Sequence, residues 1–400
     1  MSNAVYITKR ETTFSKVAQR VLGLSSQGPD VAAANPGITE PIPEGTSILV
    51  PTGEPILMGD ILPGYISVGI GGRNLPKWDR LIITQNLTGV STFSLAVVTG
   101  MSSQLKPFGY ETIQVFGCGG LIFTGRCLTY DTDTSGSLLQ VTGYSLPGVL
   151  GDCTAPISAW PLEFDGMNIA QIARKLAKPF GIKIICDAPG AAFPLTDCKT
   201  GDKVLKYLDS LAGMRNLSLR TDAEGSLIIE KIVTDAREGR INLTIGKPPL
   251  VKMSFSANGQ ALYSDIVGAE PMMYGLGGGR SRSKDPRVTV PRPLVYDIPA
   301  TLDTKVETDA TVRHARKYIS AMGIKVSIAT WKTPQGDPWS VGKLVQITGS
   351  VGRLKFKDAL FVVSQVVLSI SSDTGATADL KLALPEIYEG KVPQGDVWEY

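Results

Sequence analysis

The chain has 400 residues, which is more than one hydrophobic core serves, since single cores stop growing at roughly 250 to 300 residues. Apolar residues make up 43% of the sequence and charged residues only 19%, so the chain can bury several cores and leaves a thinly charged surface. With 40 basic and 37 acidic residues, the net charge of +3 excludes a strong overall field for nucleic acid or an anionic membrane. The 43 glycines and 26 prolines favour many turns between short strands, so we expect a β-rich α+β protein.

Metal and acid–base chemistry are limited by the single histidine, His314. The H-E-x-x-H motif and a two-histidine zinc site each need a second histidine, and no two cysteines stand in C-x-x-C spacing. No G-x-S-x-G turn marks a nucleophilic serine, and His314 falls in an expected helix, where a structural role is favoured over a catalytic one. The sequence therefore predicts no enzyme, no metal site and no cofactor.

The cysteines and the apolar stretches indicate the compartment. The cysteines are odd in number and lack metal spacing, which favours reduced, mostly buried thiols over disulfides: Cys118, Cys127, Cys153, Cys186 and Cys198. No apolar run approaches the roughly 18 residues that span a bilayer, and the N-terminal residues lack the apolar core of a signal peptide. We expect a chain made soluble in the cytoplasm, with no membrane segment.

Residues 1–52 are predicted to form a small unit of their own. Its expected elements are, in order, a strand at residues 5–7, a helix from Phe14 to Gly23 capped by Thr13, a short helix before Asn35 and a strand at residues 47–51. This β-α-α-β order, with AANPGI after the second helix and IPEGTSILVP leading into the last strand, resembles a LysM module.

The LysM resemblance implies a groove that binds N-acetylglucosamine polymers, between the first strand–helix turn and the second helix–strand loop. The groove candidates are Thr12, Thr13, Asn35, Pro36, Gly37 and Ile38. The first turn reads Arg10-Glu11-Thr12-Thr13, where the family usually has Gly-Asp-Thr. Glycan binding and docking to another protein are both open, and the altered turn favours docking.

The rest of the chain is predicted to form two small β-barrels that flank an α/β insert. The expected regions are a first barrel at residues 61–152, an insert at 153–247, a second barrel at 248–388 and an extended tail at 389–400. Strands are expected at residues 81–85, 93–97, 112–116, 121–126 and 138–142, and again at 251–255, 265–269, 324–330, 344–348, 360–370 and 378–384. One helix, over residues 309–322, interrupts the second series.

Helical periodicity marks the insert. Asn168 is placed to cap a helix with one apolar stripe that ends at Gly181, and residues 182–185 then favour a strand. A second helix is expected over residues 202–214, followed by a hairpin that joins 217–220 to 227–232.

The segment 275–293 reads GLGGGRSRSKDPRVTVPRP, and its Gly, Pro and Arg content predicts a mobile loop that does not pack. Its basic residues could touch DNA passing down a tube or an acidic neighbour, and a solvated or partner-ordered loop is favoured. These basic residues are Arg280, Arg282, Lys284, Arg287 and Arg292.

Tryptophans are candidates for core or interface positions. The tail ends in Val397-Trp398-Glu399-Tyr400, and because an exposed Trp398 and Tyr400 would have no use within their own fold, we predict that they bind a partner. Trp331 and Trp339 are expected to anchor the core and not an interface. Their rings would be buried, with each indole N–H donating to a backbone partner.

An ordered series of segments resembles a known family. It comprises PLEFDGMNIAQIARKLAKPFGIKI, TGDKVLKYLDSLAGMRNLSLRTDAEGSLIIEK, RPLVY, VRHARKY, PWSVGKLVQI and LFVVSQVVLSISSDTGATADLKLALP. This series is similar to the tail hub proteins of contractile-tailed bacteriophages, the Mu-like tail protein family. The resemblance covers residues 65–388, and the order of the segments carries it rather than any one motif.

The family resemblance implies a homotrimeric baseplate hub in a virion tail, made in the bacterial host cytoplasm. Each subunit would contribute two barrels to a sixfold tail tube, while the opposite face offers threefold symmetry to a central spike protein. The implied partners are the tube protein, the spike, other baseplate proteins and, transiently, ejected DNA.

Two other functions remain open at this point. A cell-wall-binding tail protein would use the LysM-like module for peptidoglycan, although the absence of a catalytic constellation argues against a lytic role. A secretion-type spike protein is the third, but nothing after residue 390 is long enough to form a spike, so the spike is expected to be a separate chain.

Overall fold

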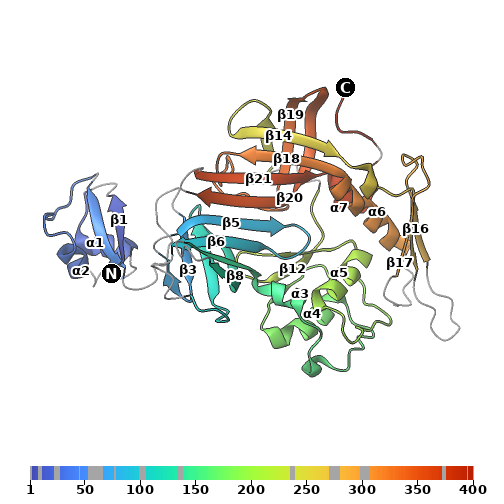
Figure 1. Ribbon diagram of the computed structural model, residues 1–400, viewed down its shortest axis with the longest axis horizontal. Coiled ribbons are helices and arrows are strands. Elements are labelled where there is room, and N and C mark those ends of the chain that lie inside the picture. The colour runs from blue at the N-terminus through green and yellow to red at the C-terminus, as the bar shows by residue number, and fades with distance from the viewer. Residues whose placement is uncertain are drawn as a thin grey trace. The chain divides into compact units, whose positions relative to one another are not determined.

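The computed structural model describes residues 2–7, 11–21, 28–44, 46–52, 66–75, 78–98, 105–132, 138–234, 239–269, 280–297, 307–371, 375–393 and 395–399. The chain is a β-rich α+β protein with a large curled, mainly antiparallel sheet and smaller sheets (Figure 1). Its contacts divide it into a first unit, residues 1–79 with 95–143, and a second unit, residues 80–94 with 144–400.

The N-terminal segment has the predicted β-α-α-β order. Its elements are β1 (Ser2–Ile7), α1 (Phe14–Val21), α2 (Gly28–Ala33) and β2 (Ser47–Thr52), and β1 pairs with β2 in antiparallel register. The helices form because apolar residues recur on one face. In the small core, the helix residues Phe14, Val17, Ala18 and Val31 meet Ile42 and Ile48. Gly23, the expected end of the first helix, lies outside the described residues.

The rest of the first unit is built from short antiparallel strands. They are β3 (Ser67–Ile70), β4 (Arg73–Asn74), β7 (Thr112–Gly117) and β8 (Gly120–Thr132). Parts of β6 (Thr92–Val98) and β9 (Leu138–Ser145) also belong to this unit. Neighbouring strands follow the order β9-β8-β7-β3-β4. The predicted Gly-rich turn joins β7 to β8 through Cys118 and Gly119, whose positive φ angles of 55° and 90° suit a tight hairpin.

The second unit contains the C-terminal strands. They are β13 (Ile241–Thr244), β14 (Leu250–Ala257), β18 (Met322–Ile328), β19 (Leu344–Val351), β20 (Leu354–Ser371) and β21 (Gly375–Ala383). Neighbours run β14-β18-β21-β20 in antiparallel pairs, while β19 pairs with β20 and, in parallel, with β13.

One strand departs from the predicted domain boundaries. β5 (Trp78–Asn86) was expected within the first barrel, but its residues 80–86 pair with residues 365–371 of β20 and belong to the second unit. The alternation within a strand sets which face it buries but not which distant strand it joins, so the sequence held no local signal for this pairing.

The α/β insert has the predicted elements. They are α4 (Ile169–Ala177), β10 (Ile184–Ile185), α5 (Val204–Met214), β11 (Ser218–Thr221) and β12 (Leu227–Glu230). A short helix that was not predicted, α3 (Val149–Asp152), precedes them. The Asn168 side chain accepts from Gln171 N–H at 3.0 Å and the Gln171 side chain accepts from Asn168 N–H at 2.9 Å, which forms a capping box. Gly181 follows in the left-handed conformation, and the helices pack on the three-stranded sheet β10-β12-β11 through one apolar core.

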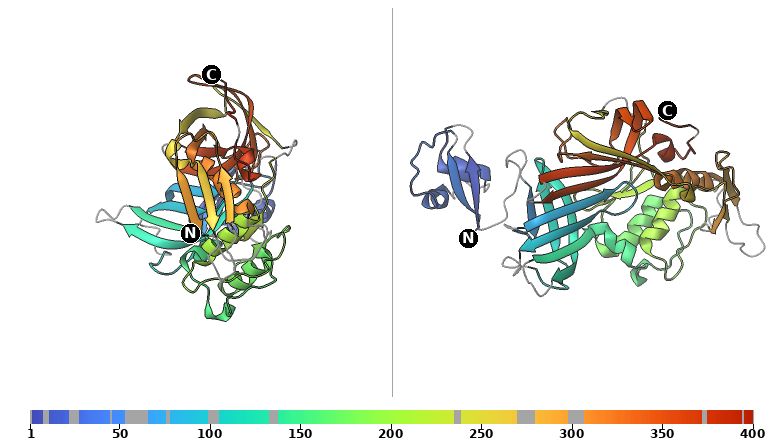
Figure 2. Two further views of the ribbon diagram at one scale, coloured as in Figure 1. Left: turned by 90° about the vertical axis from the view of Figure 1, so that its right-hand side faces the viewer. Right: turned by 45° about the horizontal axis from the view of Figure 1, so that its top comes forward.

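Part of the predicted mobile loop is a strand, which corrects the interpretation of residues 280–293. β16 (Arg280–Lys284) pairs antiparallel with β15 (Asp265–Ala269), and β17 (Pro293–Asp297) pairs parallel with β15 on its other side. This sheet lies beside α6 (Glu307–Ala321), and α7 (Pro385–Tyr388) also lies close to α6 (Figures 1 and 2). The loop interpretation failed because the inward positions of β16 are serines, not apolar residues.

Candidate partner-binding surfaces

Most of the predicted basic residues are engaged within the chain. Arg282 forms a two-pronged ion pair with Asp265, with Nε 3.0 and 3.1 Å from the two carboxylate oxygens. This ion pair lowers the pKa of Asp265, chiefly through the hydrogen bond from Arg282. Arg292 donates to the backbone oxygens of Leu262 at 2.9 Å and Gln260 at 2.8 Å. The geometry of these arginines favours a structural role for the segment.

Arg287 caps a buried polar cluster. Its guanidinium lies 4.8 Å from the centre of the Tyr318 ring and 3.7 Å from the Asp285 carboxylate. Asp285 is 2% exposed and accepts hydrogen bonds from the Tyr318 hydroxyl and, at 2.9 Å, from Arg287 N–H. Burial and the bond to Asp285 raise the pKa of Tyr318. Lys284 is exposed, and Arg280 lies in β16.

His314 belongs to the same polar packing between α6 and the small sheet. The ring is fully buried, with Nδ1 3.0 Å from Ser283 Oγ and Nε2 2.8 Å from the backbone oxygen of Tyr263. Because a carbonyl oxygen can only accept, Nε2 carries the proton and Nδ1 accepts from the Ser283 hydroxyl in the neutral ring. Ser281 Oγ accepts from Ala310 N–H at 2.9 Å in the first turn of α6. The predicted structural role of His314 is confirmed.

The C-terminal tail packs on its own chain. The prediction of a partner contact rested on the premise that Trp398 has no use within its own fold, and that premise is corrected here. The Trp398 ring lies edge-on to Phe255 at 4.7 Å and to Phe356 at 6.5 Å between ring centres. Glu399 exchanges two backbone hydrogen bonds with Lys355, at 2.8 and 2.9 Å, and its carboxylate pairs with Lys357 at 2.7 Å. Trp398 therefore has a use within its own fold, and Tyr400 lies outside the described residues.

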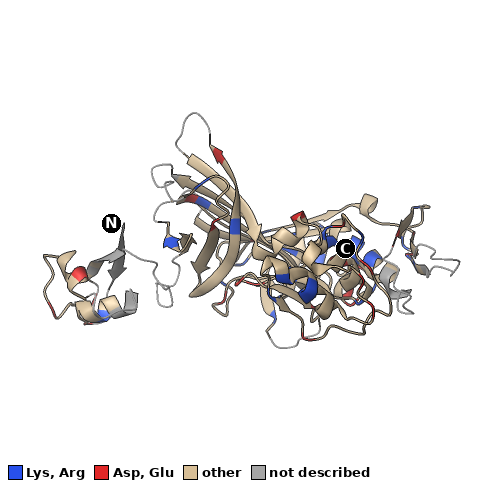
Figure 3. Cartoon of the chain, turned by 90° about the horizontal axis from the view of Figure 1, so that it is seen from below, with Lys and Arg blue, Asp and Glu red and all other residues tan. Residues whose placement is uncertain are grey.

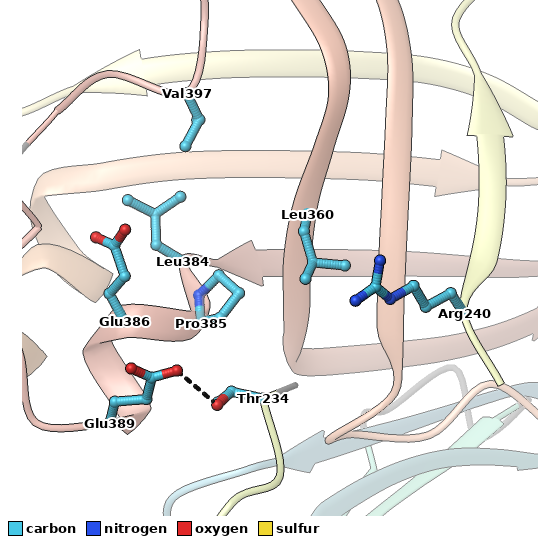
Figure 4. Close-up of a pocket in the computed structure, with 8 residues that line it drawn as sticks. All are labelled: Thr234, Arg240, Leu360, Leu384, Pro385, Glu386, Glu389 and Val397. Atoms are coloured by element: carbon cyan, nitrogen blue, oxygen red, sulfur yellow. Dashed lines mark hydrogen bonds between the residues drawn. The ribbon is translucent and has the colours of Figure 1, made fainter. Parts of the chain in front are cut away.

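A pocket of about 490 Å³ lies between α7, β20 and the tail (Figure 4). Leu360 lines it across from Glu386 and Glu389, and Val397 lines it above Leu384 in this view. The Glu389 carboxylate accepts hydrogen bonds from Lys391 Nζ and from the Thr234 hydroxyl, both at 2.9 Å. These two hydrogen bonds lower the pKa of Glu389, and the one from Lys391 has the larger effect. The mixed lining of carboxylates, Arg240 and aliphatic side chains selects no single ligand class.

The first LysM-like turn is used to build the N-terminal core. Thr12 forms a pair of backbone hydrogen bonds with Ile42, at 3.0 and 2.8 Å. The Thr13 hydroxyl accepts from Lys16 N–H at 3.4 Å, so it caps α1 as predicted. Phe14 N–H donates to the Glu40 carboxylate. These contacts bring the turn against residues 40–42.

The second LysM-like loop is also partly structural. Asn35 is 6% exposed, and its side-chain amide donates to the backbone oxygen of Val31 at 2.7 Å. Ile38 packs against the module's core, and its N–H donates to Asn35 O at 3.1 Å. Pro36 and Gly37 are exposed between them. Of the predicted groove residues, Thr13, Asn35 and Ile38 thus have clear folding roles.

Both predicted core tryptophans are buried. Trp331 is 2% exposed and its indole N–H donates to Ser369 O at 2.9 Å, as expected. Trp339 is fully buried, but its indole N–H has no hydrogen-bond partner in the described part of the chain, which differs from the expectation. The five cysteines are thiols and not disulfides. Burial raises the pKa of Cys127 to about 12 and that of Cys198 to about 11.

Charged residues of both signs are scattered over the described chain (Figure 3). Within the ranges that the structure describes, His, Cys, Asp and Glu side chains form no group of three or more suited to a metal ion. Among the described helices, none is both long and apolar enough to cross a bilayer.

Comparison with known families and structures agrees with the resemblance to phage tail proteins and does not show the LysM resemblance. Residues 147–231 match the family model for the second domain of the baseplate hub protein gp44-like family, a stretch that coincides with the α/β insert. No curated protein matches the chain.

The fold is similar to that of solved phage tail proteins. The tail protein from Neisseria meningitidis MC58 is 20% identical with a TM-score of 0.68, over 83% of this chain and 99% of that one. The 43 kDa tail protein of prophage MuSo2 from Shewanella oneidensis is 20% identical with a TM-score of 0.66, over 80% and 98%. The Escherichia coli c3393 protein, a component of the type VI secretion system, is 10% identical with a TM-score of 0.51, over 82% and 79%. The chain therefore has the fold of phage tail proteins and carries a baseplate hub gp44-like domain.

Proposed function

We propose that the chain is a structural baseplate hub protein of a phage tail or of a tail-derived particle. The observation that carries this proposal is the match of residues 147–231 to a domain of the baseplate hub gp44-like family. A fold shared over four-fifths of the chain with two phage tail proteins supports it.

In this role the chain forms a homotrimer that joins a sixfold tail tube to a threefold spike. The strands of the first unit and those of the second unit would serve as the two barrel-like elements that each subunit presents to the tube. Three copies then offer six similar surfaces on one face, while the other face keeps threefold symmetry for the spike. DNA leaving the particle would pass through the centre of this ring.

The experiment is native mass spectrometry of the purified full chain over a range of concentrations. Trimers that grow with concentration, with no dimer plateau, are expected for a ring that closes at three subunits. A chain that closes at six, or that stays monomeric at the highest concentration and in the presence of a cognate tube protein, would contradict the proposal.

We propose that the N-terminal module is a docking unit within the baseplate and not a glycan-binding LysM module. Three of its groove candidates are already used to cap a helix or fill the core, which leaves little for a sugar. A peptidoglycan pull-down with the full chain should be negative. Binding that chitooligosaccharide competes away, and that deletion of residues 1–52 abolishes, would restore the cell-wall-binding alternative.

A further inference from the structure

Three neighbouring strands of the second unit, β14, β18 and β21, carry lysines on the side of the sheet that faces away from its core (Figure 1). Lys325 of β18 lies directly opposite Lys381 of β21 in the antiparallel register. Lys252 of β14 lies opposite Ser327, the next residue of β18 on the same side. Lys252 and Lys325 are exposed and Lys381 is half-buried, whereas Val326 between them is fully buried. We call this side the lysine face.

The positive charge of the lysine face is not neutralised within the chain. None of the ion pairs in the described part of the chain includes Lys252, Lys325 or Lys381. Asp379 is the one carboxylate that the described residues of these three strands place on this side, and it accepts from the Ser327 hydroxyl at 2.5 Å. Three lysines therefore stand against one carboxylate.

The pairing of Lys325 with Lys381 is unfavourable for the sheet itself. Residues directly opposite each other in antiparallel strands have Cβ atoms about 4.5 to 5.5 Å apart, and like charges at such positions destabilise the pair. The repulsion has no compensating contact among the described residues. An anion bound over the two ammonium groups would remove it, so the register points to an anionic ligand.

The other side chains of the lysine face indicate which anion fits. The remaining described positions of the three strands on this side are hydroxyl residues and glycine: Ser254, Ser256, Gly323, Ser327 and Thr377. Protein interfaces are depleted of lysine at their centres and depend on aromatic or arginine anchors, which these positions do not offer. Phosphate groups, in contrast, bind lysine as a point charge and accept hydrogen bonds from serine and threonine hydroxyls.

We propose that the lysine face binds the phosphate backbone of double-stranded DNA through Lys252, Lys325 and Lys381, without contacts that read the bases. This inference rests on the proposed function, in which DNA leaves the particle past this chain, and adds the surface that the DNA meets. Contacts of this kind are weak and independent of sequence, because they neutralise only a few phosphates. Such contacts suit a polymer that has to slide past the protein.

The test measures binding of a fluorescent 20-base-pair duplex to the full chain by fluorescence anisotropy, over a series of salt concentrations. Binding should be detectable at low salt, and the logarithm of the binding constant should fall with the logarithm of the salt concentration with a slope of about −2.7 for three phosphates. Two duplexes of unrelated sequence should bind equally. A polyglutamate peptide is the probe for an acidic protein. No duplex binding at low salt, or tighter binding of polyglutamate, overturns the proposal.

Paired variants locate the site. Lys325→Gln combined with Lys381→Gln should weaken duplex binding about tenfold at low salt and make the salt slope shallower by about two. Lys199→Gln combined with Lys206→Gln makes the same change in net charge on exposed lysines of the insert and should leave the slope unchanged. Equal binding by the two double variants overturns the proposal.

Thermal unfolding separates binding from a structural role. Because Lys325 and Lys381 repel each other, their double variant should unfold at the same or a higher temperature than the wild type. A lower unfolding temperature would show that the lysines stabilise the sheet, and would overturn the inference of an anion site. A chain that forms trimers in native mass spectrometry but fails these tests loses this inference alone and keeps the hub proposal.

Discussion

The α/β insert and the small sheet on α6 are held together in opposite ways. The insert surrounds one apolar core that includes Ile172, Leu208 and Leu227, all fully buried. Between α6 and the small sheet, buried polar groups accompany apolar residues such as Ile266 and Ala315; the polar groups are Ser281, Ser283, Asp285 and His314. An apolar core depends on volume, whereas a polar one depends on every group keeping its partner, so the two regions should respond differently to substitution.

The largest effect is expected in the insert. Leu208→Ala on α5 removes a fully buried side chain and should lower the free energy of unfolding by about 2 to 5 kcal/mol. Urea denaturation followed by circular dichroism measures this change. Ser210→Ala, on the same helix but partly exposed, is the matched control and should change stability little. Equal losses for the two variants would show that the insert is not held by its apolar core.

In the polar region, the stability losses of two substitutions at one hydrogen bond should be coupled and not additive. Asp285→Ala leaves the buried Tyr318 hydroxyl without its acceptor and should cost about 1 to 3 kcal/mol. Tyr318→Phe removes the donor, and the double variant should cost less than the sum of the two single variants, because neither unpaired group remains. Hydrogen exchange of the β16 amides reports the change locally. If the stability losses of the two single variants simply add in the double variant, the contact between Asp285 and Tyr318 does not stabilise the region.

A smaller loss is expected at the helix cap of the insert. Asn168→Ala removes the side chain that accepts from Gln171 N–H, and should destabilise the protein by about 1 kcal/mol. Asn168→Asp keeps the acceptor and should retain most of the stability. Thermal unfolding of the wild type and the two variants side by side measures the difference. If the alanine variant is as stable as the aspartate variant, the Asn168 side chain does not stabilise the helix as a cap.

The smallest effect concerns pH and Glu389. Because the pKa of Glu389 in the folded chain is below its ordinary value, the unfolded state binds the proton more readily as the pH falls. The stabilisation that the ionised Glu389 gives the folded chain is therefore present above the ordinary pKa of about 4.3. It is lost as the pH drops through the lower pKa of the folded chain. Glu389→Gln should remove this acid-sensitive part, worth less than about 1 kcal/mol for such a partly exposed group. An identical pH profile for both proteins in denaturant titrations would contradict it.

Local signals made the insert predictable from the sequence. The Asn168 cap, Gly181 as a helix end and the hairpin turn at residues 222–225 each act through neighbouring residues, so spacing alone placed them. The strand at Arg280–Lys284 was missed because its inward serines bond to Ala310 and His314, which are distant in the sequence. Alternating Arg-Ser-Arg-Ser-Lys was the available signal.

The candidate surfaces were less predictable for the same reason. Trp398 was assigned to a partner because its contacts, Phe255 and Phe356, lie far away in the chain. A pocket between α5 and α6 joins residues from five separate segments of the chain, so no local pattern marks it. Long-range packing, not local propensity, decides which of these side chains remain available.

A cryo-electron microscopy reconstruction of the tail tip of the particle that carries this chain, computed without imposed symmetry, is the most direct test of the hub proposal. We predict three copies of the chain around the tail axis, each with strands of both units facing a sixfold tube and with the N-terminal module against another baseplate protein. Six copies in one ring, or a position away from the tail axis, would contradict it.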